Sequence, residues 1–186
     1  METAGNPETV RVGVLGGTRL PGNVETFLWN VGRLLERHPT DFQFDLVVRR
    51  DTTDGIPGYD VVDPGIEKSD RALGTIRTLT TSLTRYARRY HVDILFQVTK
   101  FPVHGFAATV AGHRTDTPVV TRFAGDNFRE YQFSERTLDR ARTFALNNLI
   151  GVVPARFSDA TIVLGPHGNS EIERRDGDGD VRIIPQ

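Results

Sequence analysis

The sequence predicts an α/β fold in which helices cover both faces of a single parallel sheet. Short apolar segments typical of strands alternate with segments of helical period along almost the whole chain. The 186 residues suit one domain and can bury roughly 70% of the surface of the unfolded chain. Such an alternation, joined by right-handed crossovers, is typical of a doubly wound, Rossmann-like sheet.

The expected strands are short runs rich in branched and aromatic residues, separated by glycine, proline or polar turns. In chain order they are Val10–Leu15, Phe42–Val48, Tyr59–Val62, Val92–Gln97, Pro118–Arg122, Ala160–Leu164 and Val181–Ile184.

Helices are expected between these strands, each with apolar residues on one face. They are Val24 to the residue before Pro39, Asp70–Tyr90, Val103–Ala111, Thr137–Leu149 and Pro166–Arg174. Asn23 is the expected N-cap of the first helix. In the second helix, one stripe comprises Leu73, Ile76, Leu79, Leu83, Ala87 and Tyr90. In the fourth, Leu138, Ala141, Ala145 and Leu149 share a face.

The composition excludes several classes of function. The net charge is −1, whereas dedicated nucleic-acid binders usually carry a strong basic excess, so no nucleic-acid partner is expected. The chain has no cysteine, which excludes disulfides and thiolate metal sites. The run Asp176–Asp180 lacks the glycine that a calcium loop needs next, and the histidines lack metal-ligand spacing. Neither a metal nor a cofactor is expected.

The ends of the chain suggest a cytoplasmic protein. No apolar run approaches the ~18 residues of a spanning helix, and Met1–Thr9 lacks the features of a signal peptide. Residues 1–9 are expected to form a flexible tail, and residues 10–186 a single domain.

Ligands of doubly wound folds bind beyond the carboxyl ends of the strands. This rule points to four loops, Gly16–Asn23, Val98–His104, Phe123–Asn127 and Gly165–Gly168. The first loop is glycine-rich and precedes a helix N-terminus, an arrangement that favours anions but also occurs in plain tight turns. Its glycines do not give the dinucleotide fingerprint, and no Tyr-x-x-x-Lys pair occurs, which disfavours an oxidoreductase.

Five segments resemble family 4 glycosyltransferases, which are retaining enzymes of the GT-B fold. The run Pro21–Leu28 after the first strand is similar to the G-G-x-E loop of that family. The other four are Val92–Leu95 with the loop carrying Lys100 and His104, Pro118–Arg122 with Gly125 and Asp126, Phe157–Leu164, and Val181–Pro185. They follow the family's order from Val10 to Gln186.

The resemblance implies the N-terminal, acceptor-side half of such an enzyme. The family's second Rossmann-like domain, which carries most nucleotide-sugar contacts, is absent from this chain. Asn23 stands where the family's loop has its second glycine, and Ala124 stands where the family commonly has a histidine. Arg122 and Asp126 are therefore the candidates for a catalytic role.

The resemblance also implies a set of substrate-binding residues. They are Gly16, Gly17, Gly22, Asn23, Glu25, Lys100 and His104. Several have plainer interpretations as well. His104 could orient an acceptor hydroxyl or simply bond to backbone at a helix start, Lys100 could be an exposed loop residue, and Asp126 could cap the next helix.

The leading hypothesis is transfer of a sugar from a nucleotide-sugar donor to a glycan or lipid-linked acceptor, completed by the second domain or a partner half. Whether this chain alone is an enzyme stays open, and the alternative is a non-catalytic module that binds a sugar or nucleotide. Arg71, Arg85, Arg88 and Arg89 lie opposite the apolar stripe of Asp70–Tyr90. They indicate either peripheral contact with an anionic membrane or an ordinary solvated helix face.

Overall fold

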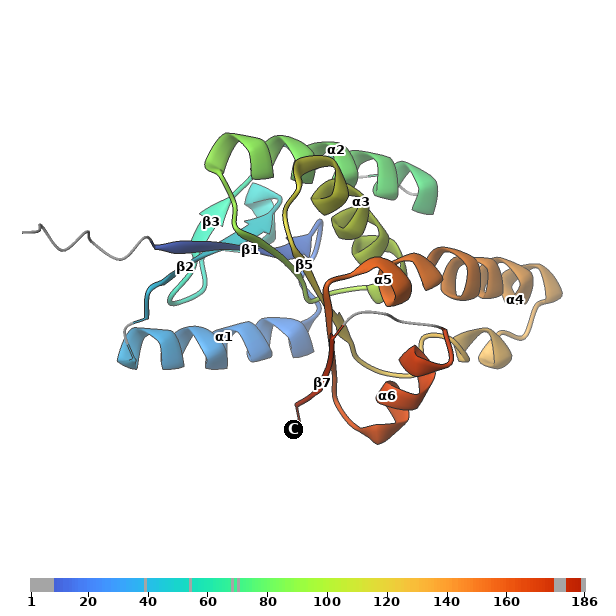
Figure 1. Cartoon of the computed structure of the whole chain (residues 1–186). Helices are drawn as coiled ribbons and strands as arrows, with labels where there is room; N and C mark the ends of the chain where they lie inside the picture. Colours follow the sequence, from blue (N-terminus) through green and yellow to red (C-terminus); the bar gives the residue numbers. More distant parts are fainter. Residues whose placement is uncertain are drawn as a thin grey trace, which may run out of the picture.

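A computed structural model describes residues 9–38, 40–53, 55–67, 69, 71–175 and 180–184 (Figure 1). The expected tail over residues 1–8 and most of the acidic turn, residues 176–179, lie outside the described residues, as does Asp70 at the expected start of the second helix.

One seven-stranded sheet in the order β3-β2-β1-β4-β5-β6-β7 forms the centre of the domain, and every pairing is parallel. The predicted doubly wound α/β class is therefore confirmed. The strands are β1 (Val10–Gly17), β2 (Phe42–Val48), β3 (Asp60–Val62), β4 (Ile94–Gln97), β5 (Val119–Phe123), β6 (Ala160–Val163) and β7 (Asp180–Ile183).

Helices cover both faces of the sheet, with α1 and α6 on one side and α2, α3 and α5 on the other (Figure 1). Their bounds are α1 (Gly22–Arg37), α2 (Ala72–Tyr90), α3 (Phe106–Thr115), α4 (Thr137–Phe144), α5 (Val152–Phe157) and α6 (Pro166–Glu173). Short turns complete the chain: the 3₁₀ turns η1 (Arg50–Thr52) and η3 (Glu130–Phe133), and the π turns η2 (Phe101–Gly105) and η4 (Ala145–Ile150).

Alternate residues of the central strands face opposite layers, and both sets are apolar. Leu15 of β1 packs with Leu79 and Leu83 of α2, whereas Val14 of the same strand packs in the cluster that contains Leu28 of α1. Burial of both faces explains why these strands read as nearly continuous apolar runs.

Two helix predictions are wrong in detail. Asn23 does not cap α1, because Pro21 occupies the N-cap position and no side chain caps the helix. The predicted apolar stripe of the second helix includes Leu73, yet this side chain is 72% exposed. It lies in the first turn of α2, and the core clusters take up α2 side chains only from the turns that follow.

The expected helix Thr137–Leu149 divides into α4 and the π turn η4. Its apolar stripe is not a core face, since Leu138 is 81% exposed and Leu149 is 66% exposed. Figure 1 shows α4 extending away from the sheet, so no sheet surface lies against this stripe. The short helix α5 was not predicted.

Beneath α2 lies a buried polar cluster that fixes the helix on the sheet. The carboxylate of Asp45 on β2 is fully buried and accepts hydrogen bonds from Arg11 Nε at 2.7 Å and Tyr86 Oη at 2.5 Å. Gly13 on β1 leaves room for the Tyr86 ring, because a Cβ there would lie 2.6 Å from it. Burial and the bond to Asp45 raise the pKa of the Tyr86 hydroxyl, so it remains a donor.

Replacing Tyr86 by Phe should destabilise the domain by about 1–3 kcal/mol, because the buried Asp45 carboxylate loses one of its donors. Urea unfolding measures this free energy. Tyr59→Phe is the matched control, since the Tyr59 hydroxyl donates to no other described residue. Equal losses in the two variants would contradict the role given to the bond with Asp45.

Candidate functional site

The sheet has a topological switch point between β1 and β4. These strands are neighbours, but β1 continues into α1 on one face, whereas β4 continues through η2 into α3 on the other. The two connections diverge beyond the carboxyl ends of the strands and leave a crevice there, which is where open α/β sheets bind ligands.

A pocket of about 150 Å³ occupies this crevice. It is lined by residues from three of the four predicted loops and the end of β5: Pro21, Asn23, Val24, Val98, Thr99, Lys100, Phe101, Arg122, Ala124 and Asn127. The loop Gly165–Gly168 does not line it. The lining contains two basic side chains and no acidic one, so the pocket favours an anionic ligand.

The glycines at the end of β1 allow the loop to pass close to its neighbours. A Cβ on Gly16 would lie 2.4 Å from Val48, and one on Gly17 would lie 2.4 Å from the His104 ring. Gly17 also has a φ of 79°, a conformation that side chains with a Cβ disfavour. Glycine is thus required at both positions by packing, while Gly22 is exposed with open space around it.

Buried polar side chains tie the three loops together. The amide of Gln97 donates to the carbonyl of Thr99 at 2.6 Å and accepts the backbone N–H of Arg122 at 3.2 Å. The Thr99 hydroxyl lies 2.6 Å from His104 Nδ1 and 3.5 Å from the carbonyl of Gly16. The relative positions of the β1, β4 and β5 ends are therefore fixed by side chains of the β4 connection.

His104 stands behind the pocket rather than in its lining. Its ring is 1% exposed, and Nε2 has no hydrogen-bond partner among the described residues. Burial, together with the nearby charge of Lys100, lowers the pKa of His104 to about 3, so the ring is neutral at physiological pH. Its predicted contact with substrate is not tested by this geometry and stays a prediction.

Arg122 at the carboxyl end of β5 lines the pocket while being only 9% exposed. Its guanidinium lies 4.7 Å from the centre of the Phe27 ring on α1. Burial lowers the pKa of this arginine, although it remains charged.

Two of the predicted residues lie at the edge of the site. Glu25, in the first turn of α1, does not line the pocket. The Asp126 carboxylate faces α6, 3.6 Å from His167 Nε2 and 4.0 Å from Arg129 Nε. Asn23 and Lys100 both line the pocket, and Lys100 is exposed with a φ of 43°.

Four further residues belong to the site or support it: Thr99 and Asn127 lie in loops predicted to form it but were not singled out, and Gln97 and Phe27 were not predicted. Gln97 and Thr99 carried a usable signal, because polar residues that follow a buried strand at the carboxyl edge are candidates for a site. Phe27 carried none, since its helical spacing is that of an ordinary core residue.

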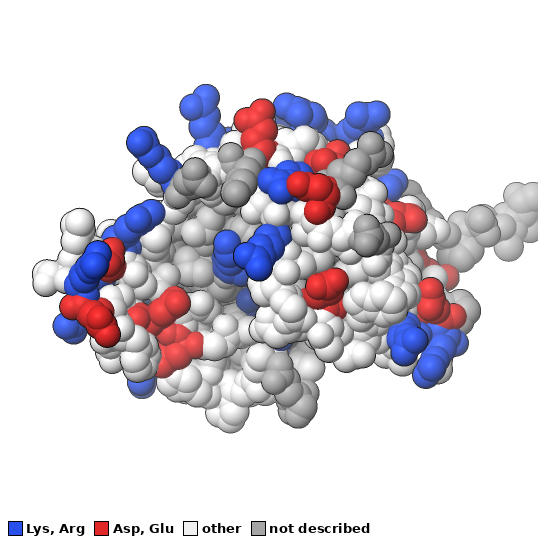
Figure 2. All heavy atoms as spheres, turned by 180° about the vertical axis from the view of Figure 1, so that it is seen from behind, with Lys and Arg blue, Asp and Glu red and all other residues white. Residues whose placement is uncertain are grey.

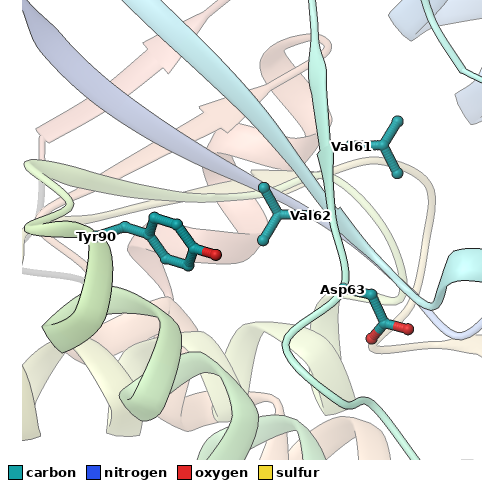
Figure 3. A pocket seen from close by; sticks show the side chains of 4 residues that line it. All are labelled: Val61, Val62, Asp63 and Tyr90. Carbon is teal, nitrogen blue, oxygen red and sulfur yellow. The ribbon is translucent and has the colours of Figure 1, made fainter.

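A second hollow of about 370 Å³ lies at the free edge of the sheet, lined by Val61, Val62 and Asp63 at β3 and by Tyr90 at the end of α2 (Figure 3). Tyr90 points toward Val62, and the Asp63 carboxylate accepts the backbone N–H groups of Gly65 and Ile66. These contacts hold the connection between β3 and α2, so we assign the hollow to the scaffold.

Among the described residues, no three His, Asp or Glu side chains are grouped so that they could hold a metal ion. No helix within the same part of the chain is long and apolar enough to cross a membrane.

His104 should make stability depend on pH. Its pKa is near 3 in the folded state and near 6.5 when unfolded, so the unfolded chain binds the extra proton between these values. The free energy of unfolding should fall as the pH drops below 6.5, by about 1.4 kcal/mol per unit. Urea unfolding of the wild type and His104→Gln at pH 7 and pH 5 measures the difference. Identical pH dependence in both proteins would show that His104 is not buried as a neutral ring.

No protein-family model matches the sequence, and neither does any curated protein. Solved structures do resemble the fold. UDP-GlcNAc 2-epimerase from Neisseria meningitidis, bound to UDP-GlcNAc, matches 94% of this chain and 46% of its own, with a TM-score of 0.61 and 15% identity. Sucrose-phosphate synthase from Thermosynechococcus elongatus matches 95% of this chain and 88% of the compared chain, with a TM-score of 0.60 and 12% identity.

The match to MurG from Acinetobacter baumannii covers 95% of this chain and 45% of the MurG chain, with a TM-score of 0.52 and 12% identity. This chain therefore spans about half the length of MurG and of the epimerases. At such low identity the likeness concerns the fold, which is the Rossmann-like half of a GT-B architecture.

Proposed function

We propose that this chain is the N-terminal, acceptor-side domain of a retaining glycosyltransferase that takes a sugar from a nucleotide-sugar donor to a glycan or lipid-linked acceptor. The observation that carries the proposal is the crevice at the β1–β4 switch point, which has two basic and no acidic side chains in its lining. It combines a glycine-rich strand end, an uncapped helix N-terminus and two cations, the groups that suit a phosphorylated ligand.

In this proposal the loop between β1 and α1 lies against the phosphates of the donor. Gly16 and Gly17 let the backbone approach, while Gly22, Asn23 and Glu25 form the first turn of α1. The departing diphosphate gains negative charge during transfer, and fixed dipoles and cations stabilise that charge. Lys100 is the cation that reaches the pocket from the β4 side.

Arg122 and Asp126 are the proposed catalytic residues near the transferred sugar, and the structure supports Arg122 better than Asp126. Arg122 lies in the pocket, whereas Asp126 would reach a ligand only by leaving His167 and Arg129. His104 would act from behind Gly17 by holding the loop, and its buried Nε2 would reach an acceptor hydroxyl only after the surrounding loops move.

A second Rossmann-like domain, or a partner half, would close the crevice from outside. The size of the pocket supports this, since its 150 Å³ is about half the lower limit of ~300 Å³ for small-molecule sites. The match to about half of MurG and of the epimerases supports it as well.

Asn23→Asp tests the proposed donor site. A carboxylate in the first turn stabilises a helix, but here it would repel a diphosphate. We expect UDP and UDP-sugars to bind the wild type, and to bind the variant roughly tenfold more weakly without loss of stability. Asn30→Asp, exposed on the same helix, is the control and should bind normally.

Calorimetric titration measures these affinities. NADH serves as the control ligand for the oxidoreductase alternative, and labelled nucleotide-sugars with acceptors should show no transfer by this chain alone. Binding of NADH instead of UDP would contradict the proposal. Binding of UDP without transfer, even when the rest of the enzyme is supplied, would favour the non-catalytic module.

We further propose that α2 brings the domain to anionic membranes. Basic side chains gather along the upper edge of Figure 2, where α2 lies. A shallow hollow of about 480 Å³ on this surface is lined by Thr81, Thr84, Arg85, Arg88, Arg89 and Arg114, with no acidic residue. Each arginine near an anionic leaflet contributes about 1 kcal/mol, so binding would be reversible.

Co-sedimentation with vesicles tests this attachment. We expect binding to anionic but not neutral vesicles, lost at high salt and lost when Arg85, Arg88 and Arg89 are replaced by glutamine. Arg77→Gln, on α2 but outside the lining of this hollow, is the control and should retain most of the binding. Equal behaviour with both lipids would leave α2 as an ordinary solvated helix.

A further inference from the structure

We propose that the guanidinium of Arg122 is the receptor for one oxyanion, a phosphate or a carboxylate, carried by the ligand of the switch-point crevice. The inference deepens the proposed function, on which it rests for the identity of the whole ligand. It assigns the chemical class of the group that this side chain recognises.

The first observation is a buried charge without a partner. Arginine side chains this deeply buried are almost always paired, because an unpaired charge in a dry environment is costly. Arg122 is 9% exposed, yet its guanidinium forms no hydrogen bond or ion pair with any other described residue. Its guanidinium lies over the face of the Phe27 ring. The ring attracts the cation but carries no negative charge that could form an ion pair with it.

The two buried carboxylates among the described residues are each paired. The Asp45 carboxylate is held by Arg11 and Tyr86. Glu171 on α6 is held by Arg129, Arg174 and Arg175, at distances of 2.9–3.0 Å. Burial favours protonation of Glu171, but the bond and charge of Arg175 and the charge of Arg129 outweigh it and lower the pKa. Arg122 departs from this pattern, and it lines the crevice at the switch point.

The second observation is that contacts within the domain already restrict the position of Arg122. Its backbone N–H donates to the Gln97 side chain, which is itself fixed by the Thr99 carbonyl. Its guanidinium lies on the ring of Phe27, which belongs to α1 on the other side of the crevice. A side chain with a fixed backbone and a guanidinium already packed on a ring loses less conformational freedom when a ligand binds, and the planar guanidinium can donate two parallel hydrogen bonds to an oxyanion.

The surroundings also favour an anion. The uncapped first turn of α1 lines the pocket through Asn23 and Val24, and Lys100 lines it from the β4 connection. The nearby carboxylates of Glu25 and Asp126 do not line it. A phosphate or carboxylate beside Arg122 would therefore meet cations and a helix N-terminus without a competing negative charge.

Thermal unfolding in inorganic phosphate, at ionic strength held constant with potassium chloride, tests the inference. Phosphate should raise the Tm of the wild type, because a ligand that binds the folded state stabilises it. Arg122→Met should abolish this shift. It should also raise the Tm without phosphate, because an unpaired buried charge is replaced by an apolar chain of similar length.

Two further variants keep the result interpretable. Arg33→Met removes another arginine from an aromatic ring, Trp29 on the exposed face of α1, and should keep the full phosphate shift. Arg122→Lys keeps the charge but not the paired donors, and should show a reduced shift even if Arg122→Met fails to fold. No phosphate shift in the wild type, or the same shift in the wild type and in either Arg122 variant, would overturn the inference.

Separate ligands identify the source of the oxyanion and separate this inference from the proposed function. UDP, a sugar phosphate and a sugar carboxylate are titrated into the wild type and Arg122→Lys. Loss of UDP affinity in the variant assigns the oxyanion to the donor, whereas loss of affinity for a sugar phosphate or sugar carboxylate alone assigns it to the acceptor.

If phosphate binds through Arg122 but no nucleotide-sugar binds, the proposed function fails and the inference stands. If nucleotide-sugars bind and none of the anions depends on Arg122, the inference fails and the proposed function stands.

Discussion

The divergence of two neighbouring strands is the constraint on which the rest of the site depends. Since β1 and β4 lie side by side but send their chains to opposite faces, the carboxyl edge of the sheet cannot be closed by either connection. The helix N-terminus of α1, the η2 turn and the end of β5 surround the opening that results. The domain obtains this crevice from its topology, and open α/β sheets generally bind ligands at such a position.

The side chains around that opening divide into those that fix the backbone and those that line the pocket. Gln97, Thr99 and the His104 ring are buried and bonded to one another or to backbone, so they set the distances between the three strand ends. Glycine at positions 16 and 17 permits this packing, because the neighbouring side chains leave no space for a Cβ at either position. Arg122 and Lys100 are then presented to the pocket as cations. A neutral His104 beside Lys100 is consistent with this division, since a second buried charge there would be strongly disfavoured.

Among the described residues, the buried charged side chains differ between the crevice and the rest of the domain. Away from the crevice, buried ions such as Asp45 and Glu171 bind neighbouring helices to the sheet through complete networks of donors. At the crevice the guanidinium of Arg122 and Nε2 of His104 lack partners among the described residues. Polar groups left unsatisfied cost stability, and natural proteins tend to keep them where a ligand supplies the missing interaction.

The sequence by itself determined the class of the fold, most strand positions and three of the loops that line the candidate pocket. Local periodicity was sufficient for these, because strands buried on both faces and helices buried on one have distinct patterns, and β2 matches its expected bounds Phe42–Val48. Tertiary structure decided which apolar stripes are buried: Ile76 of α2 is covered, but Leu73 and Leu138 face solvent because nothing packs over them. It also decided the composition of the site. Asn23, Lys100 and Arg122 meet in one pocket while Asp126 turns to His167, and Phe27 joins Arg122 from a distant helix, since contacts between remote segments leave no local pattern.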